Sequence, residues 1–223
     1  MESRIQHGDA MDVLRQWSAA GVRAQTCVTS PPYWGLRDYG VAEQLGRESS
    51  PEEYVHNLVL VFRLVRNVLA TDGTLWLNLG DAYADKKNLI GIPWMVAFAL
   101  QADGWILRQD IIWHKPNPMP ESTKDRCTKA HEYVFLLAKN PKYYYNAAAI
   151  AEPISESYAK DNRPDGVLRN SLYDNSKLVK AGLVKRREGT PLDFATRRKT
   201  RNKRSVWTVT PAPYKGAHCA VFP

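Results

Sequence analysis

Thr29-Ser30-Pro31-Pro32-Tyr33-Trp34 follows directly on residues 24–28, a short run rich in β-forming side chains. This run predicts a buried strand, so we expect the hexapeptide at the carboxyl end of that strand, where open α/β sheets bind their ligands. Two consecutive prolines fix the backbone and remove two N–H donors. The result is a rigid turn whose carbonyl groups are free to accept hydrogen bonds.

The side chains of this turn suit a planar ring that carries an exocyclic amino group. The Ser30 hydroxyl adds an acceptor for an amine hydrogen, and Tyr33 offers an aromatic face on which the ring can stack. An isolated Pro-Pro-Tyr sequence is most economically a tight turn with a packed aromatic residue. The position of the whole hexapeptide after a strand favours a functional turn instead.

The rest of the first 145 residues predicts strands and helices in alternation. Helix 51–70 has a capping box around Pro51 and ends at Asp72-Gly73, and two further helices are expected at 10–17 and 93–102. Further strands are expected at 4–7, 75–79, 105–113 and 131–138. Such alternation predicts an α/β protein with a largely parallel sheet.

Several segments together resemble the motifs of a known enzyme family. Ser30–Tyr33 resembles the Ser/Asp/Asn-Pro-Pro-aromatic catalytic motif of the amino-methylating DNA methyltransferases, which act on cytosine N4 or adenine N6. The other segments resemble motifs of that family in the same order; they are residues 8–10, 79–83, 104–108, 112–120, 131–134, 205–207 and 218–223. The resemblance therefore covers nearly the whole chain.

The resemblance implies a Rossmann-like methyltransferase sheet and transfer of a methyl group from S-adenosyl-L-methionine to a base that is flipped out of duplex DNA. Serine before the two prolines is more typical of cytosine-N4 enzymes, and aspartate of adenine-N6 enzymes. We therefore expect cytosine N4, with adenine N6 as the alternative. Methylation of cytosine carbon 5 would require a thiolate, typically from a Pro-Cys pair, which the sequence lacks. Ser30 and the basic segment described below argue against a protein glutamine as the substrate.

The resemblance also implies roles for individual residues. The expected catalytic residues are Ser30, Pro31, Pro32 and Tyr33, with the Ser30 hydroxyl and the Pro31 carbonyl accepting the two amine hydrogens. The residues expected to bind the cofactor are Asp9, Thr29, Phe222 and Pro223, and those expected to contact the base or DNA are Trp34, Lys115 and Asn117.

Two of these assignments have structural alternatives that the sequence leaves open. Asp9 is equally well placed to cap a helix that begins at residue 10. The proline-rich loop at 113–120, which in the resembled enzymes lies beside the flipped base, could equally be a rigid connection after a strand. We expect no metal site, since Cys127 and His131 have no partner pair to complete the usual four zinc ligands.

The order of the motifs resembles the permuted subgroup, in which the glycine-rich cofactor loop follows the catalytic motif. No such glycine-rich loop occurs in the sequence. A glycine-rich turn lets the backbone approach a cofactor closely. We therefore expect a partial methyltransferase sheet that lacks the strands of the cofactor loop, as in a truncated protein or the front part of a longer one.

The positive charge of the chain is concentrated in one segment. The net charge is +8, and residues 160–204 hold 14 Lys and Arg against 5 Asp and Glu. We predict a catalytic region at 1–150, a basic DNA-recognition insertion at 151–204 and a return to the catalytic domain at 205–223. Double-stranded DNA is the expected partner, contacted by Arg186, Arg187, Arg197 and Arg198. Blocks of like charge are also commonly solvated, disordered loops, and a non-catalytic DNA-binding relic is the rival interpretation of the chain.

The composition of the chain indicates the cellular compartment in which the protein is expected. Hydrophobic residues make up 44% of the chain, enough for a core, and there is no apolar stretch of membrane-spanning length and no signal peptide. Three widely spaced cysteines are typical of a reducing compartment. We expect a cytoplasmic protein without a membrane partner, with a cognate restriction endonuclease as a candidate partner; the oligomeric state stays open.

Overall fold

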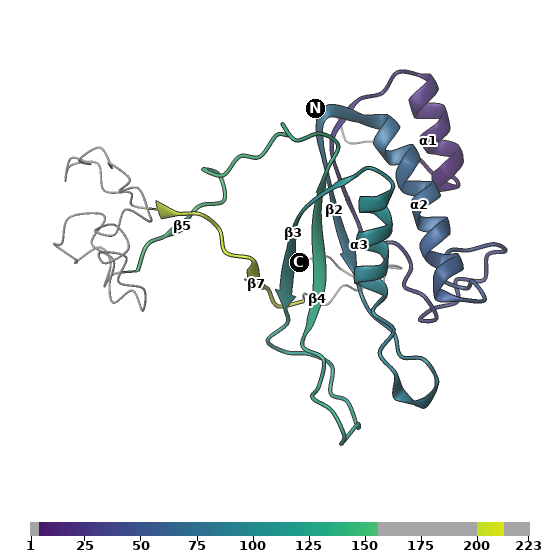
Figure 1. Ribbon diagram of the computed structural model, residues 1–223, viewed down its shortest axis with the longest axis vertical. Coiled ribbons are helices and arrows are strands. Elements are labelled where there is room, and N and C mark those ends of the chain that lie inside the picture. Colours follow the sequence, from purple (N-terminus) through teal and green to yellow (C-terminus); the bar gives the residue numbers. More distant parts are fainter. Residues whose placement is uncertain (1–4, 156–199, 212–223) are drawn as a thin grey trace, which may run out of the picture. The chain divides into compact units, whose positions relative to one another are not determined.

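The computed structural model describes residues 5–155 and 200–211 (Figure 1). The chain divides into two compact units. The first comprises Met1–Tyr145 and Arg204–Pro223, and the second comprises Asn146–Lys203. In the second unit, strand β5 (Glu152–Pro153) pairs antiparallel with β6 (Thr200–Arg201), and Glu152 forms ion pairs with Arg201 and Lys203. The predicted DNA-recognition role of residues 151–204 stays a prediction, and Arg186, Arg187, Arg197 and Arg198 lie outside the described residues.

The first unit contains a five-stranded mixed sheet in the order β1-β2-β4-β3-β7. Strand β1 is parallel to β2, β3 is parallel to β7, and β4 is antiparallel to both β2 and β3. The strands span Ala24–Thr29 (β1), Leu69–Leu79 (β2), Ile106–His114 (β3), His131–Ala138 (β4) and Val206–Thr208 (β7). The expected α/β fold is confirmed, and the largely parallel sheet contains one reversed strand, β4. As a result, the carboxyl ends of β1, β2 and β3 and the amino end of β4 meet at one edge.

In the described residues, three α-helices accompany this sheet, and Figure 1 shows α2 and α3 beside it. They are α1 (Ala10–Ala19), α2 (Pro51–Val68) and α3 (Ile92–Ala102), and a short 3-10 helix, η1, spans Asp85–Lys87. The apolar side chains of α2 and α3 pack against alternate residues of the two central strands, Leu75, Leu77 and Leu79 of β2 and Phe135 and Leu137 of β4. This period of two is expected where one face of a strand is buried.

Helix α2 shows how closely the local sequence sets the structure. The Ser50 hydroxyl accepts a hydrogen bond from the Glu53 backbone N–H at 3.2 Å, and Pro51 occupies the first turn. The buried side chains Tyr54, Leu58, Phe62, Val65 and Val68 recur at helical spacing. Burial of each aliphatic or aromatic side chain of this kind stabilises the folded protein by about 1.5–3 kcal/mol.

One expected boundary was wrong, and one suggested strand is not found in the described residues. Helix α2 ends at Val68 and the chain enters β2 at once, because Leu69 pairs with Ala24 of β1 and extends the strand through the expected stop at Asp72-Gly73. The pairing shifts register between Ala24 and Thr26. Residues 5–7, expected as the end of a strand, pair with no strand in the described part of the chain.

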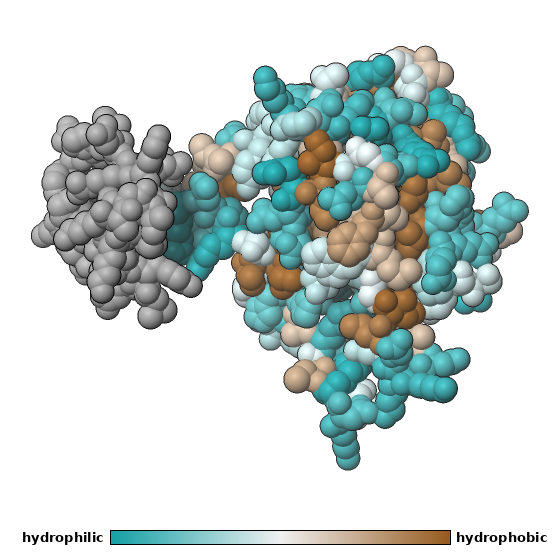
Figure 2. Space-filling view, in the orientation of Figure 1, coloured by the Kyte–Doolittle hydropathy of each residue, from teal (hydrophilic) through white to brown (hydrophobic). Residues whose placement is uncertain are grey.

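The surface of the face shown in Figure 2 is mostly hydrophilic, with separate hydrophobic patches. Within the described residues, no helix is both long and apolar enough to cross a membrane.

Candidate active site

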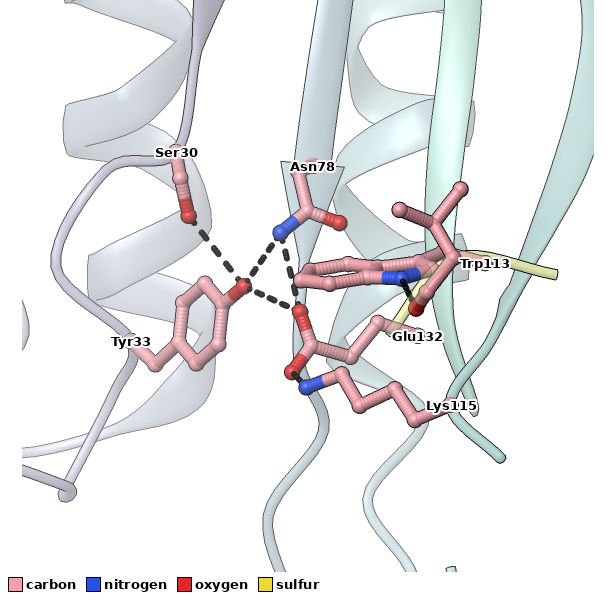
Figure 3. Close-up of polar contacts among 7 residues, drawn as sticks. Ser30, Tyr33, Asn78, Trp113, Lys115 and Glu132 are labelled. Carbon is pink, nitrogen blue, oxygen red and sulfur yellow. Dashed lines mark hydrogen bonds and ion pairs between the residues drawn. The ribbon is translucent and has the colours of Figure 1, made fainter. Parts of the chain in front are cut away.

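The shared edge of the sheet brings four polar side chains to one cavity of about 860 Å³. Ser30 follows β1, Asn78 lies near the end of β2, Lys115 follows β3, and Glu132 is the second residue of β4 (Figure 3). The reversal of β4 is what brings Glu132 here, because the amino end of β4 lies beside the carboxyl ends of its neighbours.

The turn formed by residues 30–33 is held from the core side. The Tyr54 hydroxyl donates to the Pro32 carbonyl at 2.8 Å, and burial raises the pKa of Tyr54, so this group remains a neutral donor. The Pro31 carbonyl receives no hydrogen bond from the described part of the chain. Of the carbonyls expected to be free, the turn thus keeps that of Pro31 available as an acceptor, whereas that of Pro32 is occupied by Tyr54.

Tyr33 lies at the centre of a hydrogen-bonded network of side chains (Figure 3). Its hydroxyl accepts from Ser30 Oγ at 3.1 Å and from Asn78 Nδ2 at 2.8 Å, and donates to Glu132 Oε2 at 2.8 Å. Burial, followed by the negative charge of Glu132, raises the pKa of Tyr33 far above its ordinary value. Tyr33 is therefore a neutral phenol whose ring position is fixed from three strands.

Glu132 accepts hydrogen bonds from Tyr33, from Asn78 Nδ2 at 2.9 Å, and from the Lys115 ammonium, with which it forms an ion pair. Burial raises the pKa of the Glu132 carboxyl, but the bonds from Lys115 and Asn78 outweigh it, and the net pKa lies below the usual value. Lys115 also lies 4.4 Å from the ring centre of Trp113. The cavity thus contains a charged carboxylate whose partner cation is held by an aromatic ring.

The ring of Tyr33 fits closely over Gly80, just after β2. A Cβ atom at position 80 would lie 2.5 Å from Cε2 of Tyr33, much closer than atoms can approach. Gly80 is therefore required by the position of the ring, a need that the sequence motif at 79–83 did not reveal.

Four side chains form the inner wall of the cavity, namely Ser30, Tyr33, Asn78 and Glu132. The rim comes from two loops and consists of Leu36, Tyr39, Asn117 and Met119. Large side chains of the rim are exposed, with Met119 at 85% and Leu36 at 63%. Lys115 and Asn117, expected near the base, both line the cavity, while their contact with DNA stays a prediction.

Trp34 does not line this cavity. Its indole N–H donates to the Glu48 carbonyl at 3.0 Å, and the ring packs against the main hydrophobic core. The ring is thus partly buried among apolar side chains of the core, and the expected contact of Trp34 with the base stays a prediction.

Of the four residues expected at the cofactor, the structure describes Asp9 and Thr29. The Asp9 carboxylate caps helix α1, accepting from the backbone N–H groups of Met11 at 2.9 Å and Asp12 at 3.1 Å. Of the two roles open to Asp9, this geometry is the capping role. Thr29 ends β1, and Phe222 and Pro223 lie outside the described residues. The assignment of all four to the cofactor stays a prediction.

Asn78 and Glu132 are the residues of the inner wall that sequence reasoning missed. Asn78 is 3% exposed and lies in the otherwise apolar run Leu75–Leu79, and a buried polar residue in such a strand is a signal in itself. Glu132 lies within the quoted motif at 131–134, but only the reversed strand shows that its side chain reaches Tyr33.

Other reactive groups are not gathered in the same way. In the described ranges, no set of three or more His, Cys, Asp or Glu side chains is arranged to hold a metal ion. Burial raises the pKa of the Cys27 thiol to about 11, so Cys27 is not a thiolate nucleophile.

A Rossmann-like sheet with a Ser-Pro-Pro-Tyr turn at the carboxyl end of a strand defines a methyltransferase that acts on amino groups. Residues 24–223 match the family model of the N6 and N4 enzymes, described as DNA methylase. The chain therefore belongs to the N6/N4 DNA methylase family. The expected permuted subgroup and the expected truncation stay predictions.

Individual relatives agree with this family. The chain is 42% identical over 97% of its length to the Type II methyltransferase M.Cfr9I of Citrobacter freundii, and 41% identical over 99% to M.XycI of Xanthomonas campestris pv. cyanopsidis. It is similar in fold to the cytosine-N4-specific PvuII DNA methyltransferase, with a TM-score of 0.51 and 19% identity over 63% of this chain. The chain spans 67% and 69% of the two relatives and 50% of the PvuII chain.

The methyl donor of this family is S-adenosyl-L-methionine. The inner wall fits the acceptor side of such a reaction, because an unbonded carbonyl, a hydroxyl and an aromatic ring line one cavity.

Proposed function

We propose that the protein is a site-specific DNA methyltransferase that transfers a methyl group to the exocyclic N4 of cytosine, with S-adenosyl-L-methionine as the donor. The observation that carries this proposal is the placement of Ser30, Pro31 and Tyr33 in one cavity at the carboxyl end of β1. The relatives are Type II methyltransferases, and membership in the family supports DNA as the substrate.

In this proposal the inner wall increases the reactivity of a weak nucleophile, the exocyclic amine of cytosine. The lone pair of the cytosine amine is delocalised into the ring. The Ser30 hydroxyl and the Pro31 carbonyl accept its two hydrogens, which turns the nitrogen towards a tetrahedral form and frees the lone pair. The anchored ring of Tyr33 contacts the flipped base and holds it in line. When bound, S-adenosyl-L-methionine supplies the methyl group.

The choice of cytosine rests on Ser30, since aspartate at this position is usual in adenine-N6 enzymes. The same wall accepts hydrogens from either exocyclic amine, so adenine N6 is the alternative product. Carbon-5 methylation requires a thiolate, typically from a Pro-Cys pair, which the sequence lacks, and burial raises the pKa of the Cys27 thiol.

Mass spectrometry of nucleosides from DNA treated with the full-length protein tests the proposal directly. N4-methylcytosine is the expected product. Detection of N6-methyladenine would show instead that the substrate is adenine. 5-Methylcytosine would refute the amine mechanism. DNA binding without any methylated base would instead support the rival interpretation of a non-catalytic DNA-binding relic.

The basic segment 160–204 is proposed to contact duplex DNA, with Arg186, Arg187, Arg197 and Arg198 among its phosphate ligands. If about six phosphates are contacted, affinity falls roughly a thousandfold between about 50 and 200 mM salt. Replacing the four arginines together by glutamine should flatten this dependence on salt. If the dependence of DNA affinity on salt is unchanged in the fourfold variant, the surface that binds DNA lies elsewhere on the protein.

A cytoplasmic location and a cognate restriction endonuclease complete the proposal, since both relatives compared above are Type II methyltransferases.

A further inference from the structure

Three groups of the inner wall form a directed chain of hydrogen bonds (Figure 3). Ser30 Oγ–H donates to the Tyr33 hydroxyl at 3.1 Å, and the Tyr33 hydroxyl donates to Glu132 Oε2 at 2.8 Å. Both donors in this series point towards the Glu132 carboxylate. A chain of hydroxyl groups aligned in this way can move a proton along its whole length, because each oxygen accepts one proton as it passes on another.

Methylation of an exocyclic amine creates a need for such a chain. As the amine nitrogen forms its bond to the methyl carbon, the bond from that carbon to the sulfonium sulfur breaks, and the nitrogen becomes positively charged. The product is neutral, so the nitrogen must release one hydrogen as a proton. The Pro31 carbonyl can accept a hydrogen bond but has no proton of its own to pass on. The Ser30 hydroxyl has one.

We propose that Ser30, Tyr33 and Glu132 form a proton relay that removes the proton of the methylated amine. The proton moves from nitrogen to Ser30 Oγ, the hydroxyl proton of Ser30 moves to Tyr33, and that of Tyr33 moves to Glu132, which ends as a neutral carboxylic acid. This inference rests on the proposed function, because it requires an amine as the methyl acceptor.

The surroundings of Glu132 suit the end of such a relay. Its other partners, Lys115 and Asn78, donate hydrogen bonds to it and fix the carboxylate in place. A low pKa of the Glu132 carboxyl does not prevent proton uptake, since an aryl amine that carries an extra methyl group and a positive charge is a much stronger acid. The Glu132 side chain retains 18% exposure, so its proton can return to water between turnovers.

Asn78 provides no alternative path, because its amide protons are not exchanged through the side chain in a single step. Lys115 takes part in the ion pair as an ammonium and has no free lone pair to accept a proton. Tyr33 is the only hydroxyl between Ser30 and Glu132 among the side chains drawn in Figure 3. Removal of this one oxygen therefore interrupts the relay and retains the aromatic ring.

The test compares Tyr33→Phe and Glu132→Gln with the wild-type enzyme in single-turnover methylation of a DNA duplex. Loss of positioned proton transfer should lower the rate constant about a hundredfold or more in each variant. Because the three groups act as one unit, the double variant should be no slower than the slower single variant. Tyr144→Phe, an exposed tyrosine near the opposite end of β2, is the matched control and should keep the wild-type rate.

Two readouts separate a relay from a merely structural role. The fluorescence of a 2-aminopurine placed next to the target base should report unchanged base capture in Tyr33→Phe, because the ring is retained. In mixtures of light and heavy water, the wild-type rate should fall along a curve, since several protons move together. In Tyr33→Phe the curvature should disappear.

Each outcome bears on the relay. A rate within about twofold of the wild type in Tyr33→Phe would overturn it, and so would a wild-type rate that does not respond to heavy water. Slow variants whose base capture is lost equally would assign the network to positioning alone and overturn the relay. If the wild-type protein methylates no base, the proposed function fails and the relay fails with it. If the wild-type protein methylates an amine and Tyr33→Phe and Glu132→Gln methylate it at the wild-type rate, the relay fails and the proposed function stands.

Discussion

The inner wall and the rim of the cavity are two sides of the same site with opposite construction. Ser30, Tyr33, Asn78 and Glu132 bond to one another in the inner wall, and they come from the ends of three adjacent strands. The rim, by contrast, carries Met119 at 85% exposure and Tyr39 at 54% on loops. Groups that must be aligned for chemistry are fixed by the sheet, whereas groups that meet a large substrate are left free to adapt.

The largest effect expected from this comparison is at Ser30. Ser30→Ala removes the inner-wall acceptor for the target amine and should lower the single-turnover methylation rate about 10²–10³-fold, with DNA affinity nearly unchanged. Rapid-quench measurement of methyl transfer tests this. Ser18→Ala in helix α1 is the control and should leave the rate as it is. A normal methylation rate in Ser30→Ala would show that the inner wall does not take part in methyl transfer.

Gly80→Ala tests how tightly the inner wall is packed. The added methyl group would lie 2.5 Å from the ring of Tyr33 and must displace it, which should lower the free energy of unfolding by about 1–3 kcal/mol and weaken base capture. Urea denaturation and base-capture fluorescence measure the two effects.

The Tyr33→Ala background supplies the control for Gly80→Ala, because the space is then empty. The alanine at position 80 should cost much less there than in the wild type. An equal cost in both backgrounds would show that the ring of Tyr33 is not what excludes a side chain at position 80.

Tyr54→Phe tests the support behind the wall. It removes the hydrogen bond to the Pro32 carbonyl and should reduce the free energy of unfolding by about 1 kcal/mol. Chemical denaturation is the measurement, with the exposed Tyr144→Phe expected to be neutral. If Tyr54→Phe proves equally neutral, the turn is rigid through its prolines alone.

The smallest effect on stability is expected at the rim. Met119→Ala should change the free energy of unfolding by less than about 0.5 kcal/mol, because the side chain packs against little. Any measurable consequence should appear in DNA affinity by fluorescence anisotropy. A loss of stability as large as that of Gly80→Ala would show that the contrast between wall and rim is false.

The sequence predicted the parts of the site that depend on local order. The turn at 30–33, its place after β1, and the caps of α2 all follow from residues within a few positions of each other. The order of the strands does not, because nothing near residue 131 indicates that β4 inserts between β2 and β3. The bond between Tyr33 and Glu132 depends on that insertion and was therefore missed. The placement of Trp34 depends in the same way on packing between distant elements.

The insertion of β4 also has a consequence for how the protein folds. Tyr33 and Glu132 are separated by 99 residues, and β3, which precedes β4 in the chain, lies beyond it in the sheet. The antiparallel pair β3–β4 must therefore reach β2 with β4 foremost, and contacts between such distant segments form slowly. Until this docking occurs, β1, β2 and the helices can be native in structure while the hydroxyl of Tyr33 has no carboxylate. In refolding, catalytic competence should consequently appear after most of the helical structure has been recovered.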